Sequence, residues 1–170
     1  MRMTIKLLGP RSSFGLAVAA ATVLADQASK LIVLRVLDLN LGNALFVTPF
    51  LDLVLIFNRG ISYGLFPQDS EYGRWLLVAL NLAAAAFFSF WIARTSSRLV
   101  AAALGLLIGG ALGNALDRTI YGAVVDFISL HAFGWRWYVF NLADSAIVAG
   151  VVGLLYDVTH ATKSPPSGGH

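Results

Sequence analysis

Two aspartates, Asp126 and Asp144, bracket an aromatic-rich segment that lies between two strongly apolar stretches. A carboxylate at the edge of a membrane-spanning stretch is energetically costly, so each of these acids needs a reason to be there. Two carboxylates within hydrogen-bonding range do not both ionise readily, and they share a proton instead. The ionised partner can take a proton from water while the protonated partner donates to the peptide carbonyl under attack. The chemistry open to such a pair is peptide hydrolysis without a metal or a covalent intermediate.

The residues by themselves leave another interpretation of these acids open. Asp126 and Asp144 could be structural, capping a helix or pairing with Arg118. Spacing shows that the two acids are able to meet, because the chain leaves one apolar stretch before Asp126 and enters the next near Asp144. Spacing does not select this pair over Asp26 or Asp117.

Other chemistries have little support in the sequence. The chain has no cysteine, which excludes disulfides, thiolate metal sites and a thiol nucleophile. It has no HExxH motif, nucleophile elbow or phosphate-binding glycine loop. Ser29 and Lys30 are adjacent and diverge on a helix, so they cannot act on each other. A net charge of +3 without a basic run gives no indication of nucleic-acid binding. We expect neither a metal nor a cofactor.

The composition is that of an integral membrane protein. Of the 170 residues, 58% are hydrophobic and 12% are charged, about half the charged share of a soluble domain. Four apolar stretches are predicted to span the bilayer as helices. Their approximate bounds are 14–34, 75–93, 99–117 and 139–156. The first stretch could also be a cleaved signal peptide, but apolar residues resume after Lys30, which favours an uncleaved span.

The segments between the spans also carry information. An apolar run over 50–57, within a punctuated segment at 38–66, predicts a small extracytoplasmic β-containing structure. A second extracytoplasmic segment, 119–138, is rich in aromatic residues and is either an interfacial belt or a lid. The tail at about 160–170 is predicted to be disordered. Four spans place both termini and the basic 94–98 connection on one side, and the density of basic residues there predicts that this side is cytoplasmic. The predicted class is mainly α, a single polytopic membrane domain.

Polar residues recur inside three of the predicted spans. Asp26 and Lys30 lie four residues apart, the spacing of an ion pair on one helix face. The third span has a polar stripe formed by Gly110, Asn114 and Arg118. The start of the fourth span has a polar face formed by Asn141, Asp144 and Ser145. Glycines at every fourth position of the third span predict close approach of a neighbouring helix: Gly105, Gly109 and Gly113. The polar faces on three spans predict a shared polar interior near one end of the bundle. The pathway of a transporter would show the same pattern.

These residues occur in motifs that resemble a known family, the bacterial lipoprotein signal peptidases (signal peptidase II), which are membrane aspartic peptidases. The matching pieces appear in the family's order along the chain: Asp26-Gln27-Ala28-Ser29-Lys30; Asn58-Arg59-Gly60 with Ser62, Tyr63 and Gly64; Gly109-Gly110-Ala111-Leu112-Gly113-Asn114; Asp117-Arg118; Gly122; Val125-Asp126-Phe127; and Phe140-Asn141-Leu142-Ala143-Asp144-Ser145. Two positions depart from the usual pattern. Tyr63 replaces a common Phe or Trp, and Tyr138 replaces a frequent Pro.

The resemblance implies a function and a set of site residues. It implies that Asp126 and Asp144 are the catalytic pair. It also implies supporting residues that line or hold the site: Asp26, Lys30, Asn58, Gly60, Gly110, Asn114, Arg118 and Asn141. Members of the family remove the signal peptide of a prolipoprotein just before a diacylglyceryl-modified cysteine, and globomycin-type cyclic peptides inhibit them. The implied location is the bacterial inner membrane, among its lipids, with the active site near the periplasmic face. We expect a monomer.

Two other functions remain open at this point. A small ion-coupled transporter or channel subunit could use the intramembrane Asp, Lys and Arg residues, although the two halves of the chain show no convincing repeat. A non-catalytic membrane scaffold could be built on the glycine face of the third span.

Overall fold

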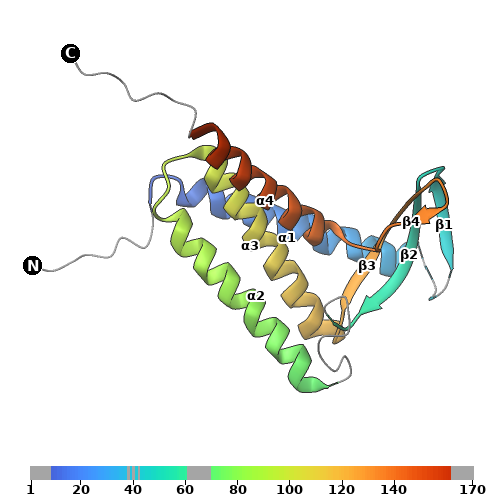
Figure 1. Cartoon of the computed structure of the whole chain (residues 1–170). Coiled ribbons are helices and arrows are strands. Elements are labelled where there is room, and N and C mark those ends of the chain that lie inside the picture. The colour runs from blue at the N-terminus through green and yellow to red at the C-terminus, as the bar shows by residue number, and fades with distance from the viewer. Residues whose placement is uncertain (1–8, 38, 40, 42, 61–69, 162–170) are drawn as a thin grey trace, which may run out of the picture.

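The computed structural model describes residues 9–37, 39, 41, 43–60 and 70–161 (Figure 1). Within these residues it is mainly helical, with a small antiparallel sheet, which confirms the predicted class. The helices are α1 (Ser12–Arg35), α2 (Glu71–Ile92), α3 (Arg98–Tyr121) and α4 (Leu142–Ala161). The strands are β1 (Ala44–Thr48), β2 (Leu51–Asn58), β3 (Val124–Ala132) and β4 (Trp135–Arg136).

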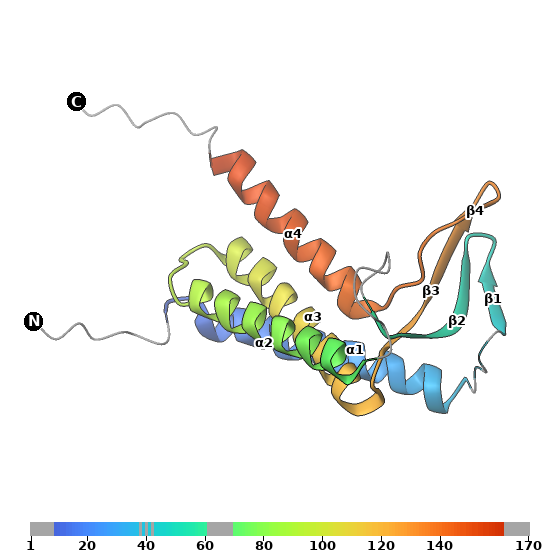
Figure 2. The same cartoon turned by 60° about the horizontal axis from the view of Figure 1, so that its bottom comes forward.

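In the described part of the chain, all four helices are long and apolar enough to cross a membrane. α3 extends a full turn beyond the predicted third span, and α4 begins three residues later than the predicted fourth span. The predicted tail at 160–170 starts inside α4, whose last residue is Ala161, and positions 162–170 lie outside the described residues. The start of α1, the connection between α2 and α3, and the end of α4 lie at one end of the bundle, and the sheet lies at the other end (Figures 1 and 2).

The centre of the bundle is α3, which contacts each of the other three helices and is the most buried of the four. Its glycines allow this contact. A side chain at Gly109 would lie 2.8 Å from the backbone oxygen of Ala19, and one at Gly105 would meet the backbone oxygen of Gly15. The predicted close approach of a neighbouring helix is therefore confirmed, and the neighbour is α1. Because α1 packs here along α3, it is a member of the bundle.

The two ends of α3 are defined by local interactions. At its start, the hydroxyl of Ser97 accepts a hydrogen bond from the backbone N–H of Val100 (3.3 Å), a helix N-cap. At its end, Gly122 adopts a left-handed conformation (φ 74°), which glycine tolerates better than other residues. The chain reverses there and enters β3 two residues later.

The sheet is built from two segments that are far apart in the sequence. Its strand order is β1-β2-β3-β4, and all neighbouring strands are antiparallel. The strand predicted over 50–57 corresponds to β2. β3 was not predicted as a strand; it occupies the segment that the sequence analysis described only as aromatic. Its pairing with β2 places Asn58 opposite Val124 and Ile56 opposite Asp126.

Apolar packing attaches the sheet to the end of α1. Val33 of α1, Leu55 of β2, and Val125 and Phe127 of β3 form one buried cluster. A second buried cluster fills the helical bundle, around Leu104 and Ile108 of α3. The junction between the two clusters is where α1, α3, β3 and the start of α4 meet.

Candidate active site

Asp126 and Asp144 lie at this junction, on different elements. Asp126 is the third residue of β3 and is 2% exposed. Asp144 is in the first turn of α4 and is half-buried. A backbone bridge between Ile128 and Phe140 holds the chain that enters α4 against β3. This bridge brings the residue that follows Phe140, Asn141, beside Asp126.

Asn141 links the two carboxylates. Its side-chain amide nitrogen donates to Asp126 Oδ1 at 2.7 Å, and its backbone N–H donates to Asp144 Oδ2 at 3.3 Å. Asn141 itself is fully buried. The sequence analysis placed Asn141 on the face of the fourth helix; it instead precedes α4, and its side-chain oxygen accepts the N–H of Asp144 at 2.9 Å.

Two further asparagines complete the hydrogen bonding of the acids. Asn114 of α3 donates to Asp144 Oδ1 at 2.9 Å and accepts from the Asn141 side chain at 3.2 Å. Asn58, at the end of β2, donates to Asp126 Oδ2 at 3.0 Å. The orientation of Asn58 is itself held, because its side-chain oxygen accepts the backbone N–H of Gly60 at 3.2 Å. Both carboxylates are thus surrounded by amide donors, which suits ionised or proton-sharing acids.

Arg118 lies one turn beyond Asn114 on α3. The hydrogen bond that it makes among the described residues goes to the backbone oxygen of Asn114 (3.4 Å). Its Nε is buried and has no hydrogen-bond partner in that part of the chain. Arg118 therefore brings a positive charge to this end of the bundle.

The environment of Asp126 favours its protonated form. Burial raises the pKa of Asp126 to about 6, and the nearby charge of Asp144 raises it as well. The amide hydrogen bonds from Asn58 and Asn141 act in the opposite direction, because they favour the charged form. A carboxyl that gains and loses a proton near neutral pH is suited to general acid–base chemistry.

A second group of charges lies deeper, between α1 and α3. Lys30 contacts both Asp26 Oδ2 and Asp117 Oδ2 at 2.7 Å, and all three side chains are buried. The predicted Asp26–Lys30 pair is therefore confirmed. The sequence analysis named no partner for Asp117, and the structure gives it Lys30 of α1. Gln27 was also missed: its amide donates to Asp117 Oδ1 at 2.9 Å and to Asp26 Oδ2 at 3.1 Å.

Of the remaining residues of the predicted site and its motifs, Gly110 lies at a helix contact, and several others lie outside the described residues. Gly110 does not face the acids; a side chain there would collide with Ile147 and the backbone oxygen of Ala143, so this glycine lets the start of α4 pack on α3. Ser62, Tyr63 and Gly64, which belong to the recognised motifs, lie outside the described residues. Within those residues no three His, Cys, Asp or Glu side chains are grouped so that they could hold a metal ion.

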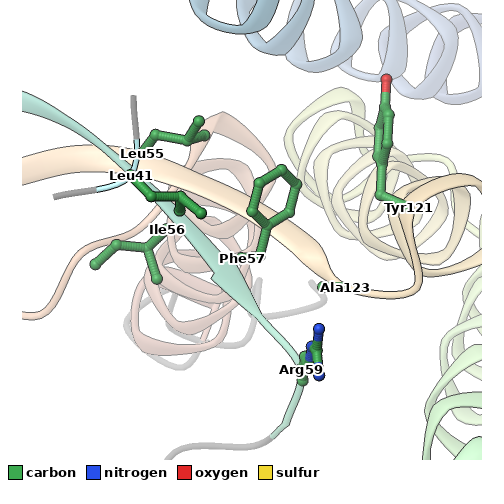
Figure 3. Close-up of a pocket in the computed structure, with 7 residues that line it drawn as sticks. All are labelled: Leu41, Leu55, Ile56, Phe57, Arg59, Tyr121 and Ala123. Atoms are coloured by element: carbon green, nitrogen blue, oxygen red, sulfur yellow. The ribbon is translucent and has the colours of Figure 1, made fainter. Parts of the chain in front are cut away.

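A cavity of about 600 Å³ lies beside the site, between β2 and the end of α3 (Figure 3). It is lined by Leu41, Leu55, Ile56, Phe57, Arg59, Tyr121 and Ala123. Most of these side chains are apolar, and neither Asp126 nor Asp144 is among them. The cavity is therefore a recess next to the end of β2, where Asn58 lies, and is separate from the carboxylates.

The fold and the site together define a class: a multi-pass membrane protein with two acids, both hydrogen-bonded to Asn141, at the end of its helical bundle, an arrangement suited to acid–base hydrolysis. The model of the family described as signal peptidase (SPase) II matches residues 18–160. The chain belongs to the signal peptidase II family.

Proteins and structures similar to this chain agree with that assignment. A protein of Methylobacterium sp. (strain 4-46), named lipoprotein signal peptidase, is 57% identical over 143 residues, 84% of this chain and 87% of that protein. One of Methylorubrum extorquens (strain PA1) with the same name is 54% identical over 162 residues, 92% of this chain and 95% of that protein. A bacterial membrane enzyme solved by the in meso method at 2.3 Å resolution has a TM-score of 0.79 and 25% identity, covering 93% of this chain and 94% of that one. Membership of a peptidase family leaves the transporter and scaffold hypotheses without support.

Proposed function

We propose that this chain is an aspartic endopeptidase that removes the signal peptide from diacylglyceryl-modified prolipoproteins, cleaving before the lipid-modified cysteine. Asp126 and Asp144 are the catalytic pair. The observation that carries this assignment is the position of Asn141, which donates to both acids from the point where β3 and α4 meet. The names of the curated relatives support the reaction.

The two carboxylates divide the proton transfers between them. The ionised acid takes a proton from water as the water oxygen bonds to the carbonyl carbon of the scissile peptide. The protonated acid gives its proton to the carbonyl oxygen, which yields a tetrahedral diol. When the C–N bond breaks, the first acid gives its proton to the departing nitrogen and the diol returns a proton to the second acid. Asp126, whose pKa is raised to about 6, is the acid that we expect to hold the shared proton before attack.

The neighbouring polar residues have separate tasks. Asn58 and Asn114 each hold one oxygen of a catalytic acid and so orient it. Arg118, whose Nε is buried and has no hydrogen-bond partner among the described residues, supplies a positive charge that stabilises the charge developing on the carbonyl of a bound peptide. Globomycin-type cyclic peptides would compete for these same polar groups.

A lipid-modified substrate stays in the bilayer, so the site has to be at the edge of the membrane. Large aromatic side chains at the β3–β4 end of the sheet are strongly exposed, including Phe133 (98%) and Trp135 (81%). Such side chains suit the headgroup region of a membrane. We infer that the sheet lies at the periplasmic face of the bacterial inner membrane and that both termini are cytoplasmic.

The test is cleavage of a diacylglyceryl-modified prolipoprotein peptide in detergent. Wild-type protein should cut before the modified cysteine, and Asp126→Asn and Asp144→Asn should each reduce the rate by at least about 1,000-fold. Asp157→Asn, at the far end of α4, is the matched control and should cleave normally. Full activity of folded Asp126→Asn or folded Asp144→Asn would refute the assignment of these two acids as the catalytic pair. Absence of cleavage by wild type would refute the function.

A further inference from the structure

The two carboxylates buried between α1 and α3 contact Lys30 and also accept hydrogen bonds from the backbone of other elements. Asp117 Oδ2, which contacts Lys30, also accepts the backbone N–H of Val125 at 3.0 Å. Val125 is the residue immediately before Asp126. One carboxylate of the group therefore accepts a hydrogen bond from the backbone of β3 directly beside Asp126.

The other carboxylate makes the equivalent contact with α4. Asp26 Oδ1 accepts the backbone N–H of Ala143 at 2.9 Å, while its Oδ2 contacts Lys30 at 2.7 Å. Ala143 is fully buried and immediately precedes Asp144. Its N–H is one of those at a helix start that have no partner within the helix, and a carboxylate is favoured at that position.

Lys30 thus contacts both carboxylates, and each carboxylate accepts a backbone hydrogen bond beside one of the two catalytic acids. We propose that Lys30, Asp26 and Asp117 are positioning residues that hold the backbone of Asp126 and the backbone of Asp144 at a fixed separation. This inference rests on the proposed function, since it assigns the network to the reaction of that pair. Among the described residues, none of the three side chains makes a hydrogen bond to the carboxylate of Asp126 or Asp144; their hydrogen bonds to the neighbouring backbone go to the N–H groups of Val125 and Ala143.

Stability alone is a weak explanation for this arrangement. Burying two carboxylates and one ammonium is costly, and replacing buried ion networks by apolar residues is often neutral or stabilising. Geometry explains it better. Asp126 and Asp144 belong to a strand and a helix that could slide past each other, and a misplacement of about 1 Å in an active site can cost about 100-fold in rate.

Asp117→Ala tests the inference, because it removes the acceptor for the Val125 N–H. We expect kcat for the lipid-modified peptide to fall about 100-fold while KM changes less than about threefold, measured well below the unfolding midpoint. Asp117→Asn keeps an oxygen for Val125 but loses the charge that contacts Lys30, so its kcat should lie about tenfold below wild type. The pH dependence of kcat should also shift in Asp117→Ala, because a displaced Asp126 no longer interacts with Asp144 in the same way.

Ser97→Ala is the matched control on the same helix. It also removes a side-chain acceptor for a backbone N–H, that of Val100, but at the opposite end of α3. It should lower the unfolding midpoint and leave kcat unchanged. If folded Asp117→Ala has kcat within about fivefold of wild type, the positioning role is wrong. If Asp117→Ala does not fold, Asp117→Asn takes its place in the test. A kcat for Asp117→Asn within about fivefold of that for Ser97→Ala would then show that the positioning role is wrong. Failure of wild type to cleave would instead reject the proposed function itself.

Discussion

Asn141 and Asp144 exchange two hydrogen bonds across the first turn of α4. The N–H of Asp144 donates to Asn141 Oδ1 at 2.9 Å, and the N–H of Asn141 donates to Asp144 Oδ2 at 3.3 Å. This reciprocal arrangement is a capping box, in which the first residue and the fourth satisfy each other's backbone donors. Here the acid of the capping box is also a proposed catalytic residue, so one local motif both starts the helix and orients the acid.

The two roles of Asn141 can be separated by substitution. Asn141→Ala removes the cap and the donor to Asp126, so it should lower the free energy of unfolding by at least about 1 kcal/mol and reduce cleavage by at least about tenfold. Asn141→Ser retains a cap acceptor but cannot donate to Asp126 Oδ1 in the same way. It should recover part of the stability without recovering cleavage. Thermal unfolding and peptide cleavage in the same detergent measure both effects. Normal cleavage by the serine variant would show that the amide donor is dispensable.

The stability of Asp126→Asn relative to wild type should depend on pH. The pKa of Asp126 is raised from its ordinary value of 3.8 to about 6 in the folded protein. Between these values the folded state retains a proton that the unfolded state has released, so wild type loses stability as pH rises through this window. The asparagine variant has no such loss. It should gain about 2–3 kcal/mol relative to wild type between about pH 4 and about pH 7.5. An unchanged difference in unfolding free energy across that range would contradict the raised pKa.

The contact between α3 and α1 should be sensitive to one added methyl group. In Gly109→Ala the new carbon would lie 2.5 Å from the Cβ of Thr22 and 2.8 Å from the backbone oxygen of Ala19. We expect a loss of about 1–3 kcal/mol in unfolding free energy. Gly153→Ala on α4 is the control: its new carbon would have Ala103 Cβ as its nearest neighbour, at 3.1 Å. That variant should be near wild type in thermal unfolding, and an equal loss in both variants would argue against tight α1–α3 packing.

The proposed membrane orientation can be tested with single cysteines, because the chain has none of its own. Phe133 and Ser96 are both exposed. They belong to the β3–β4 turn and to the connection between α2 and α3, and these two segments lie at opposite ends of the molecule (Figure 1). A membrane-impermeant maleimide should label Phe133→Cys in intact spheroplasts and Ser96→Cys only after the membrane is opened. The reverse pattern would place the termini on the periplasmic side.

The sequence alone determined the class of the protein and the features that depend on neighbouring residues. The apolar stretches have the length of the hydrocarbon layer, so the four helices could be predicted with their ends accurate to about one turn. The Asp26–Lys30 pair followed from the four-residue spacing within one helix. The glycine repeat indicated a close helix contact, although not that α1 is the partner. The proposed catalytic pair was singled out by resemblance, since spacing did not separate Asp126 and Asp144 from Asp26 or Asp117.

Only the tertiary structure decided which distant segments meet. β3 is a strand because it pairs with β2, roughly seventy residues earlier in the chain. Asp117 is part of the site's support because its partners, Lys30 and the N–H of Val125, belong to another helix and to the strand after it. Contacts of this kind leave no periodic pattern in the sequence, because they depend on how whole elements pack. The packing of α1, α3, β3 and α4 at one junction turns separate acids into a shared site.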